Sequence, residues 1–179
     1  MKNYALIILI SLISFGGFSQ NKVNWVTVEK AQELNEKAPK KIFIDVYTKW
    51  CGPCKMFSRT TLKDSAVVAY LNEHFYSIKF DGEGADSATF NGKVYKNPNH
   101  NPESRGRNSM HQLTPVFAAN PEGKVFYPTV AFLNSDLTML TNTAGVIDAK
   151  KFLIILHFLN EEAYKTTTFD KYFTEKSKS

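Results

Sequence analysis

The chain contains two cysteines, Cys51 and Cys54, and only two residues separate them. An apolar run at residues 41–47 precedes the pair and is typical of a buried strand. Residues 55–59 follow with a composition that favours a helix. A Cys-x-x-Cys pair at a strand-to-helix junction is the setting in which this spacing predicts thiol–disulfide chemistry.

The start of a helix is a place where one thiol of the pair would become reactive. Unpaired backbone N–H groups and the positive end of the helix dipole stabilise a thiolate there. Pro53 suits an early helical position, because its missing N–H has no partner to lose. We therefore expect Cys51 to be the exposed nucleophile. Cys54, one turn further along, would be the shielded thiol that resolves the mixed disulfide.

A structural disulfide or half of a zinc site would use the same two cysteines. A structural zinc ion needs two further ligands, usually a second cysteine pair or spaced histidines. The sequence has no second pair, and its four histidines show no ligand spacing. Redox chemistry without a metal is therefore the preferred interpretation. A structural disulfide and the carriage of a soft metal ion by the two thiols stay open as alternatives.

Asp45 places a carboxyl group within the apolar run of residues 41–47. A buried charge is costly unless it is paired or has a function. Burial would raise the pKa of this carboxyl group, which could then take the proton of Cys54 through a water molecule. The alternative is a structural ion pair with a lysine such as Lys79.

Two segments of the sequence resemble the thioredoxin family. Residues 45–55, DVYTKWCGPCK, resemble the active-site segment, and residues 127–133, YPTVAFL, resemble the strand that follows a cis-proline. Residues 56–81 are similar to a branch of secreted thioredoxin-like proteins related to the C-terminal domain of the membrane electron transporter DsbD. The resemblance spans residues 25–160. It implies an α/β thioredoxin fold, with a central mixed sheet of four or five strands and helices on both faces.

The resemblance also implies which residues form the redox site. Asp45 stands six residues before Cys51, at the position of the family's buried acid. The roles of nucleophile for Cys51 and resolving thiol for Cys54 agree with those of the family. Together these three residues are the predicted catalytic set.

The predicted substrate-binding surface consists of Trp50, Gly52, Pro53, Tyr127 and Pro128. Trp50 would pack beside the disulfide and offer a flat apolar face to partner proteins, or simply fill the core. A cis bond before Pro128 would bring the backbone of Tyr127 beside the thiols, where an extended substrate strand can pair with it. A tyrosine before the proline departs from the usual choice in cytoplasmic thioredoxins.

Pro115 is a second candidate for the cis-proline, and chain order decides between the two. A polar turn at residues 134–136, a strand at 137–142 and a helix from Asp148 follow Pro128. That order completes a thioredoxin fold, whereas only another strand follows Pro115. Pro128 is therefore the predicted cis-proline.

Residues 84–108 form an insertion before the cis-proline strand and are rich in Gly, Asn, Pro and Ser. An Asn-Gly dipeptide predicts a small hairpin at residues 90–95, and Ser109 is placed to cap a following helix. A long irregular segment within a compact domain is usually functional or mobile. We hypothesise that the insertion flanks the Cys51 face and selects the partner. A solvated surface elaboration is the alternative.

Residues 1–19 have the features of a secretory signal peptide. Lys2 gives a positive start, residues 4–13 are apolar, and small residues precede a cleavage site after Ser19. The apolar run is shorter than the roughly 20 residues of a spanning helix, so a cleaved signal is preferred over an uncleaved anchor. We expect a domain at residues 20–165 in an exported protein, periplasmic or secreted, where disulfides persist.

Short polar residues mark the starts of three predicted helices, at Thr27, at Asp64 or Ser65, and at Asp148. Residues 166–179 form a polar, lysine-rich tail. We expect this tail to fray, unless its aromatic residues dock back onto the domain.

The charge pattern gives little support to a nucleic-acid partner. The formal net charge is +5, and the basic residues are spread along the chain. They form no cluster interleaved with aromatic residues, which nucleic-acid binding would favour. We therefore expect protein partners.

The predicted function is that of an exported thiol–disulfide oxidoreductase that reduces protein disulfides. The Gly-Pro dipeptide between the cysteines resembles that of reducing thioredoxins more than that of strong oxidants. The resemblance implies a membrane thiol-electron transporter as donor, misoxidised proteins or apocytochrome c as acceptors, and no bound cofactor. We expect a monomer. An oxidase or isomerase is the alternative within this class, and a non-catalytic thioredoxin-fold binding module is the alternative outside it.

Overall fold

A computed structural model describes residues 22–178, so the predicted signal peptide lies outside the described residues. A five-stranded sheet with the order β1-β3-β2-β6-β7 forms its centre. Its strands are β1 (Trp25–Val26), β2 (Lys41–Tyr47), β3 (Phe75–Asp81), β6 (Thr129–Leu133) and β7 (Met139–Ala144). Strand β3 is parallel to β1 and β2, whereas β6 is antiparallel to β2 and β7. The mixed sheet confirms the predicted fold class.

Strand β2 is central because its sequence suits burial on both faces. Its five inner residues, Ile42 to Val46, are all buried, as expected for a near-continuous apolar run. Residues 42 and 44 face one side of the sheet and Phe43 faces the other, because side chains alternate along a strand. The strand ends at Tyr47, where the chain turns towards the cysteine pair.

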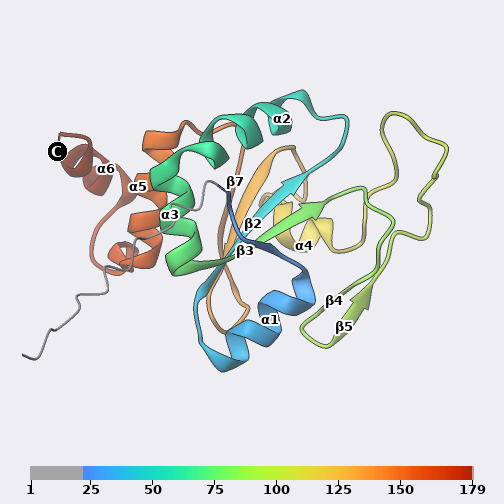
Figure 1. Ribbon diagram of the computed structural model, residues 1–179, viewed down its shortest axis with the longest axis horizontal. Helices are drawn as coiled ribbons and strands as arrows, with labels where there is room; N and C mark the ends of the chain where they lie inside the picture. Colours follow the sequence, from blue (N-terminus) through green and yellow to red (C-terminus); the bar gives the residue numbers. More distant parts are fainter. Residues whose placement is uncertain (1–21, 179) are drawn as a thin grey trace, which may run out of the picture.

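One face of the sheet is covered by helices that lie at the upper left in Figure 1. They are α2 (Gly52–Arg59), α3 (Ser65–His74), α5 (Ala149–Asn160) and α6 (Phe169–Ser177), with 3-10 turns at Thr61–Lys63 and Ala163–Lys165. Phe152 of α5 packs edge-on against Phe43 and Phe57, with ring centroids 5.6 and 5.4 Å apart. These aromatic contacts fix α2, and with it the cysteine pair, against the sheet.

The other face is covered by α1 (Val28–Lys37) and α4 (Thr114–Ala118), together with a hairpin of β4 (Ala88–Phe90) and β5 (Lys93–Tyr95). Phe117 of α4 is fully buried and packs edge-on against Phe80 and Phe90. Helices therefore lie on both faces of the sheet, as predicted, and the hairpin of the insertion extends the second layer (Figure 1).

The predicted helix starts at Thr27, Asp64 and Asp148 are confirmed. Each side chain accepts a backbone N–H in the first turn of its helix, at 3.1 Å for Thr27 and 2.9 Å for Asp148. Asp64 accepts two such bonds, from the backbone nitrogens of residues 66 and 67. A cap of this kind stabilises a helix by about 1 kcal/mol, so these local signals act in the same direction as the core.

The insertion contains the predicted hairpin but not the helix predicted from Ser109. Asn91 and Gly92 adopt the left-handed backbone of a tight turn, with φ of 49° and 74°. Helix α4 instead begins at Thr114, because the Ser109 hydroxyl donates to the Asn97 side chain at 2.7 Å and does not cap a helix. The serine thus stabilises the loop of the insertion.

The C-terminal segment differs from a frayed tail. Helix α6 packs on α5, and Tyr172 is buried against Phe158 with ring centroids 5.2 Å apart. The Tyr172 hydroxyl also donates to Glu161 at 2.7 Å. Aromatic side chains at positions 169, 172 and 173 share one helical face, so they dock while the lysines face water. The segment is therefore part of the folded unit.

Candidate active site

The cysteine pair lies where β2 passes into α2. Cys51 is the N-cap residue of α2, and its Sγ accepts the backbone N–H of Cys54 at 3.1 Å. Pro53 stands in the first helical turn. A disulfide joins Cys51 and Cys54, with Cα atoms 5.3 Å apart. The structure thus confirms the predicted strand-to-helix setting, and it shows the pair in its oxidised state.

The two cysteines do not differ in exposure in the way the sequence suggested. Cys51 is 1% exposed and Cys54 is 4% exposed, so the expectation of an exposed Cys51 is wrong for the oxidised protein. The reason is local, because the Cys51 side chain turns back onto the first helical turn, where it meets both the sulfur and the N–H of Cys54. The assignment of Cys51 as the nucleophile therefore depends on its place at the helix N-terminus and stays a prediction.

Asp45 forms an ion pair with Lys79 deep in the sheet. The parallel register of β2 and β3 places the two residues opposite each other, and their side chains meet at 2.8 Å. Burial raises the pKa of the Asp45 carboxyl group, and the charge of Lys79 opposes this shift. The structural ion pair considered from the sequence therefore exists.

The ion pair uses only one of the two carboxylate oxygens of Asp45. Its Oδ2 accepts from Lys79, whereas Oδ1 is buried and has no hydrogen-bond partner within residues 22–178. A cavity of about 160 Å³ adjoins the site and is lined by Cys54, Thr48, Ser58 and Lys79, among others. It has room for water between Cys54 and the ammonium group that contacts Asp45. The proton-relay role of Asp45 is compatible with this arrangement and stays a prediction.

The peptide bond between Tyr127 and Pro128 is cis, as predicted. Pro115, the rejected candidate, lies in the first turn of α4. The Tyr127 ring meets Trp50 edge-on, with centroids 6.1 Å apart, and burial raises the pKa of its hydroxyl group to about 12. The cis-proline segment and the redox loop, residues 48–51 between β2 and α2, are therefore in contact through these two aromatic rings.

Gly82 completes this contact and was not identified from the sequence. A Cβ atom at this position would lie 2.7 Å from Cε1 of Tyr127, closer than real side chains approach. Only glycine therefore lets the Tyr127 ring reach its place beside Trp50. The sequence offered no signal for this close approach, because the two residues are far apart along the chain.

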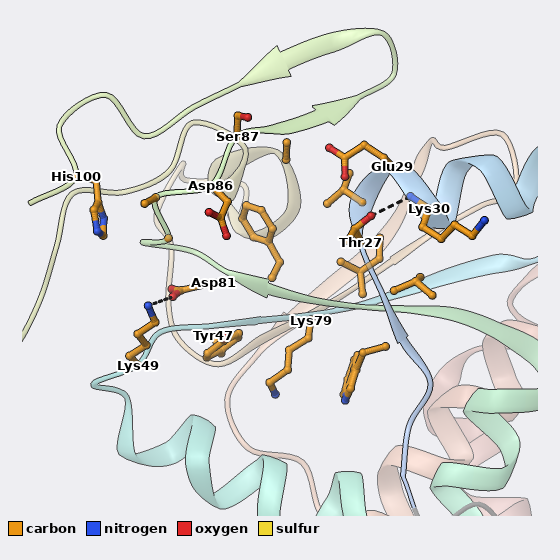
Figure 2. A pocket seen from close by; sticks show the side chains of 18 residues that line it. Thr27, Glu29, Lys30, Tyr47, Lys49, Lys79, Asp81, Asp86, Ser87 and His100 are labelled. Atoms are coloured by element: carbon orange, nitrogen blue, oxygen red, sulfur yellow. Dashed lines mark hydrogen bonds and ion pairs between the residues drawn. The ribbon is translucent and has the colours of Figure 1, made fainter. Parts of the chain in front are cut away.

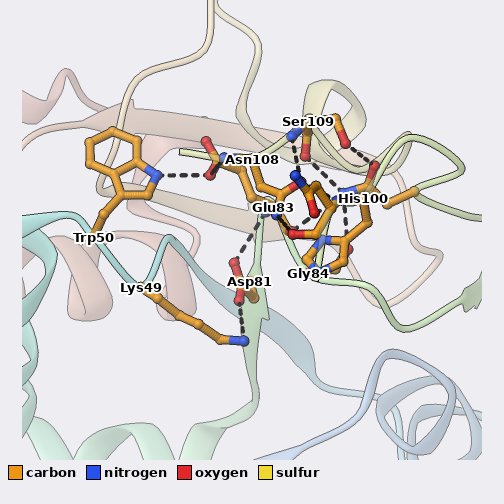
Figure 3. Close-up of polar contacts among 10 residues, drawn as sticks. Lys49, Trp50, Asp81, Glu83, Gly84, His100, Asn108 and Ser109 are labelled. Carbon is orange, nitrogen blue, oxygen red and sulfur yellow. Dashed lines mark hydrogen bonds and ion pairs between the residues drawn. The ribbon is translucent and has the colours of Figure 1, made fainter. Parts of the chain in front are cut away.

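Trp50 is held by Glu83 and by residues of the insertion that follows it. The sequence did not predict these contacts. Its Nε1 donates to Glu83 Oε2 at 2.8 Å, and the backbone N–H of Asn108 donates to the same oxygen at 2.7 Å (Figure 3). The guanidinium of Arg107 lies over the indole ring, 4.6 Å from its centroid. The indole therefore is not a bare apolar face, and the insertion flanks the redox loop as hypothesised.

A larger cavity of about 700 Å³ lies between the start of α1, the end of β3 and the insertion. Figure 2 shows Tyr47 and Lys79 at its floor, with Asp81, Asp86 and His100 on the side of the insertion. Tyr47 and Lys79 also line the smaller cavity beside Cys54. The Lys79 ammonium group stands 4.7 Å from the Tyr47 ring centroid. Lys79 therefore lines both cavities, of which only the smaller one reaches Cys54.

Within residues 22–178 no group of three or more His, Cys, Asp or Glu side chains is arranged to hold a metal ion. In the same part of the chain, no helix is both long and apolar enough to cross a membrane.

Residues 28–160 match the family model of the thioredoxin-like domain, so the chain belongs to the thioredoxin-like family. With the Cys51–Cys54 disulfide at its redox loop, it is a thioredoxin-fold thiol–disulfide oxidoreductase. No match is found among the curated proteins.

Solved structures with this fold cover most of the chain. A thioredoxin-fold protein from Helicobacter pylori is 13% identical and has a TM-score of 0.60, with 90% of this chain and 96% of that chain covered. A putative disulphide-isomerase from Bacteroides thetaiotaomicron is 26% identical, with a TM-score of 0.51 and coverages of 77% and 93%. The C-terminal domain of DsbD from Neisseria meningitidis is also a neighbour, at 19% identity, a TM-score of 0.45 and coverages of 74% and 91%.

Proposed function

We propose that the protein reduces disulfides in exported proteins. The observation that carries this proposal is the Cys51–Cys54 disulfide at the N-terminus of α2, in a fold whose cis-Pro128 segment contacts the redox loop through Tyr127 and Trp50. The pair can cycle between a disulfide and a dithiol, and the helix N-terminus favours the thiolate in the reduced state.

In the reduced protein, the Cys51 thiolate attacks one sulfur of a substrate disulfide. One substrate sulfur leaves as a thiolate and takes a proton, while the other is held by Cys51 in a mixed disulfide. Cys54 then loses its proton and attacks the Cys51 sulfur. This step releases the second substrate thiolate and restores the Cys51–Cys54 disulfide. The substrate gains two electrons and two protons, and the protein loses the same number.

Asp45 is the proposed acceptor of the Cys54 proton. Its raised pKa and its unpartnered Oδ1 suit a group that binds a proton within the fold. Water in the cavity beside Cys54 would carry the proton, because no direct bond joins the two side chains.

The substrate segment is proposed to bind beside the cis-proline. The backbone of Tyr127 would pair with an extended strand of the partner. Gly52 is exposed next to Cys51 and an added Cβ there would meet nothing within 4 Å, so there is space for a partner segment over this residue. Pro53 is exposed in the same turn and would border the bound strand.

The direction of electron flow and the location of the protein are proposed from the sequence. The Gly52-Pro53 dipeptide supports a reductant, and the signal-peptide features of residues 1–19 support export. A reductant outside the cytoplasm needs a donor, for which a membrane thiol-electron transporter is the proposed class. Misoxidised proteins or apocytochrome c are the proposed acceptors, and no cofactor is needed for the exchange.

Trapping experiments test the exchange itself. Cys54→Ser should accumulate a mixed disulfide with a peptide disulfide, because Cys51 can attack but nothing resolves the product. Cys51→Ser should form no such species. A trap that forms on Cys54 rather than on Cys51, or no trap on either, would refute the assigned order of attack.

Disulfide isomerisation is a second candidate function. The 26% identity to the protein described as a putative disulphide-isomerase favours it. Reactivation of a scrambled disulfide protein separates the two functions, because an isomerase restores native pairing without net consumption of reductant. A reductase consumes one dithiol for each disulfide that it opens.

A further inference from the structure

Trp50 is a fixed platform beside the disulfide. Glu83 Oε2 accepts the indole N–H on one side, and the Tyr127 ring meets the indole edge-on. The same carboxylate oxygen accepts the N–H of Asn108, so the insertion and the redox loop share one anchor (Figure 3). An indole held in this way keeps its ring face in a constant orientation next to Cys51.

Arg107 is placed on this platform by the insertion. Its guanidinium carbon lies 4.6 Å from the Trp50 ring centroid, in the geometry of a cation–π contact. A stacked guanidinium uses its face for the ring and keeps N–H donors at its edge, in a fork that matches a carboxylate. The ring thus pre-organises the arginine for binding.

Arg107 has no acidic partner of its own among the described residues. Within residues 22–178 it takes part in no ion pair, and its side chain is exposed. Glu83 is occupied by Trp50 and Asn108. Asp81 is mostly buried, accepts the N–H of Glu83 and lies 3.7 Å from Lys49. One oxygen of Glu83 and the Asp81 carboxylate are therefore engaged elsewhere, whereas the Arg107 guanidinium forms no ion pair within the described residues.

The exposed surface beside the disulfide is cationic. The charged residues of α2 are Lys55 and Arg59, and both are exposed. Lys49, in the redox loop, has 81% of its side chain exposed. Asp86 and Glu103 are exposed acidic residues on the insertion and are exceptions to this pattern. A partner that approaches Cys51 therefore meets positive charge on the α2 side, and charges of both signs, Arg105 and Arg107 among them, on the insertion side.

We propose that Arg107 is a specificity-determining residue that binds a carboxylate next to the disulfide of the partner protein. The preferred substrates are then disulfides whose flanking residues are aspartate or glutamate. This inference rests on the proposed function, because it names the substrate class of the same redox site. The carboxylate accepts hydrogen bonds from the N–H groups of the guanidinium, and the cation–π contact with the indole keeps the guanidinium beside the bound strand.

Two matched peptides test the inference. Each contains one intramolecular disulfide, and they differ only in a glutamate or a glutamine beside the cysteine. Pre-reduced protein, freed of reductant, is mixed with excess peptide, and the second-order rate constant of peptide reduction is measured. We expect the wild type to favour the glutamate peptide about tenfold, a factor that corresponds to about 1.4 kcal/mol.

Variants of two neighbouring arginines provide the control. Arg107→Gln should reduce the preference to less than about threefold. Arg105→Gln removes the same charge from the same loop, but within the described residues Arg105 makes no ring contact. It should retain most of the preference. Arg107→Lys, which keeps the charge without the planar fork, should fall between the wild type and Arg107→Gln.

The outcomes separate this inference from the function on which it depends. If the wild type reduces both peptides at equal rates, or if Arg107→Gln keeps the full preference, the inference is overturned and the reductase function stands. If the wild type reduces neither peptide, the proposed function itself fails. Should Arg107→Gln not fold, the wild-type preference is measured from 0.05 to 0.5 M salt. A preference for glutamate that salt does not weaken would also contradict the proposal, because an exposed ion pair is screened.

Discussion

Substituting Asp45 by asparagine removes the buried charge at the redox site without changing the size of the side chain. Lys79 compensates only one carboxylate oxygen, at 2.8 Å, and the other oxygen is buried without a partner in the described chain. Lys79 has 28% of its side chain exposed, so water still reaches its ammonium group when the carboxylate is lost. We expect Asp45→Asn to raise the free energy of unfolding at pH 7 by about 1–2 kcal/mol, since a half-compensated buried charge is more costly than a neutral amide.

The expected gain depends on pH in a defined direction. Burial raises the pKa of folded Asp45 above the value of about 3.9 in an unfolded chain. Between these two pKa values the folded state keeps a proton that the unfolded state releases, so this group lowers stability as pH rises. Urea unfolding of the oxidised proteins should therefore show Asp45→Asn above the wild type at pH 7, with the two nearly equal at pH 4.

Substitution of the other partner of the ion pair, Lys79, is the matched control. Lys79→Met leaves the Asp45 carboxylate buried without compensation and should lower the free energy of unfolding by about 3 kcal/mol at pH 8. The loss should shrink at pH 4, where Asp45 is protonated. A wild type at least as stable as Asp45→Asn at pH 7 would show that the buried carboxylate does not destabilise the fold. A difference in free energy of unfolding between the two proteins that stays constant with pH would show the same.

Three further substitutions test other parts of the structure. Gly82→Ala places a Cβ 2.7 Å from the Tyr127 ring; we expect a loss of about 1–3 kcal/mol by thermal unfolding and slower peptide reduction, and unchanged kinetics would contradict the close contact. Burial lowers the pKa of His111, so unfolding takes up a proton and the free energy of unfolding falls as pH drops below about 6.5. His111→Asn should make the free energy of unfolding depend less on pH in this range, and an unchanged pH dependence would exclude His111 as its source. Tyr172→Phe deletes the hydroxyl that donates to Glu161 at 2.7 Å and should cost about 1 kcal/mol in urea unfolding, whereas no loss would mean that α6 docks through its rings alone.

Features that depend on neighbouring residues in the chain were predictable from the sequence. The Cys-x-x-Cys setting, the caps at Asp64 and Asp148, and the turn of the hairpin all rest on local chemistry. The choice of Pro128 needed only the order of the following elements, because few topologies allow that order. Local sequence chemistry and the order of the elements therefore specify most of the fold.

Features that depend on contacts between distant segments were not predictable in the same way. Nothing in the sequence near Trp50 indicates that Glu83 accepts its indole N–H or that Asn108 donates to the same carboxylate oxygen, since the Trp50–Glu83 and Asn108–Glu83 contacts span 33 and 25 residues. Ser109 has the chemistry of a helix cap, but a competing bond to Asn97 decides its role. The exposure of Cys51 likewise depends on how its side chain turns onto α2, which spacing alone does not determine.

The reduction potential of the Cys51–Cys54 pair determines whether the protein reduces disulfides or forms them. Protein spanning residues 20–179, which lacks the predicted signal peptide, would be equilibrated against dithiothreitol or glutathione redox mixtures, and the fraction of disulfide measured by alkylation. We expect a value near that of thioredoxin, about −270 mV, which would make the protein a reductant. A value near that of the strong oxidant DsbA, about −120 mV, would contradict the proposed direction and identify an enzyme that forms disulfides.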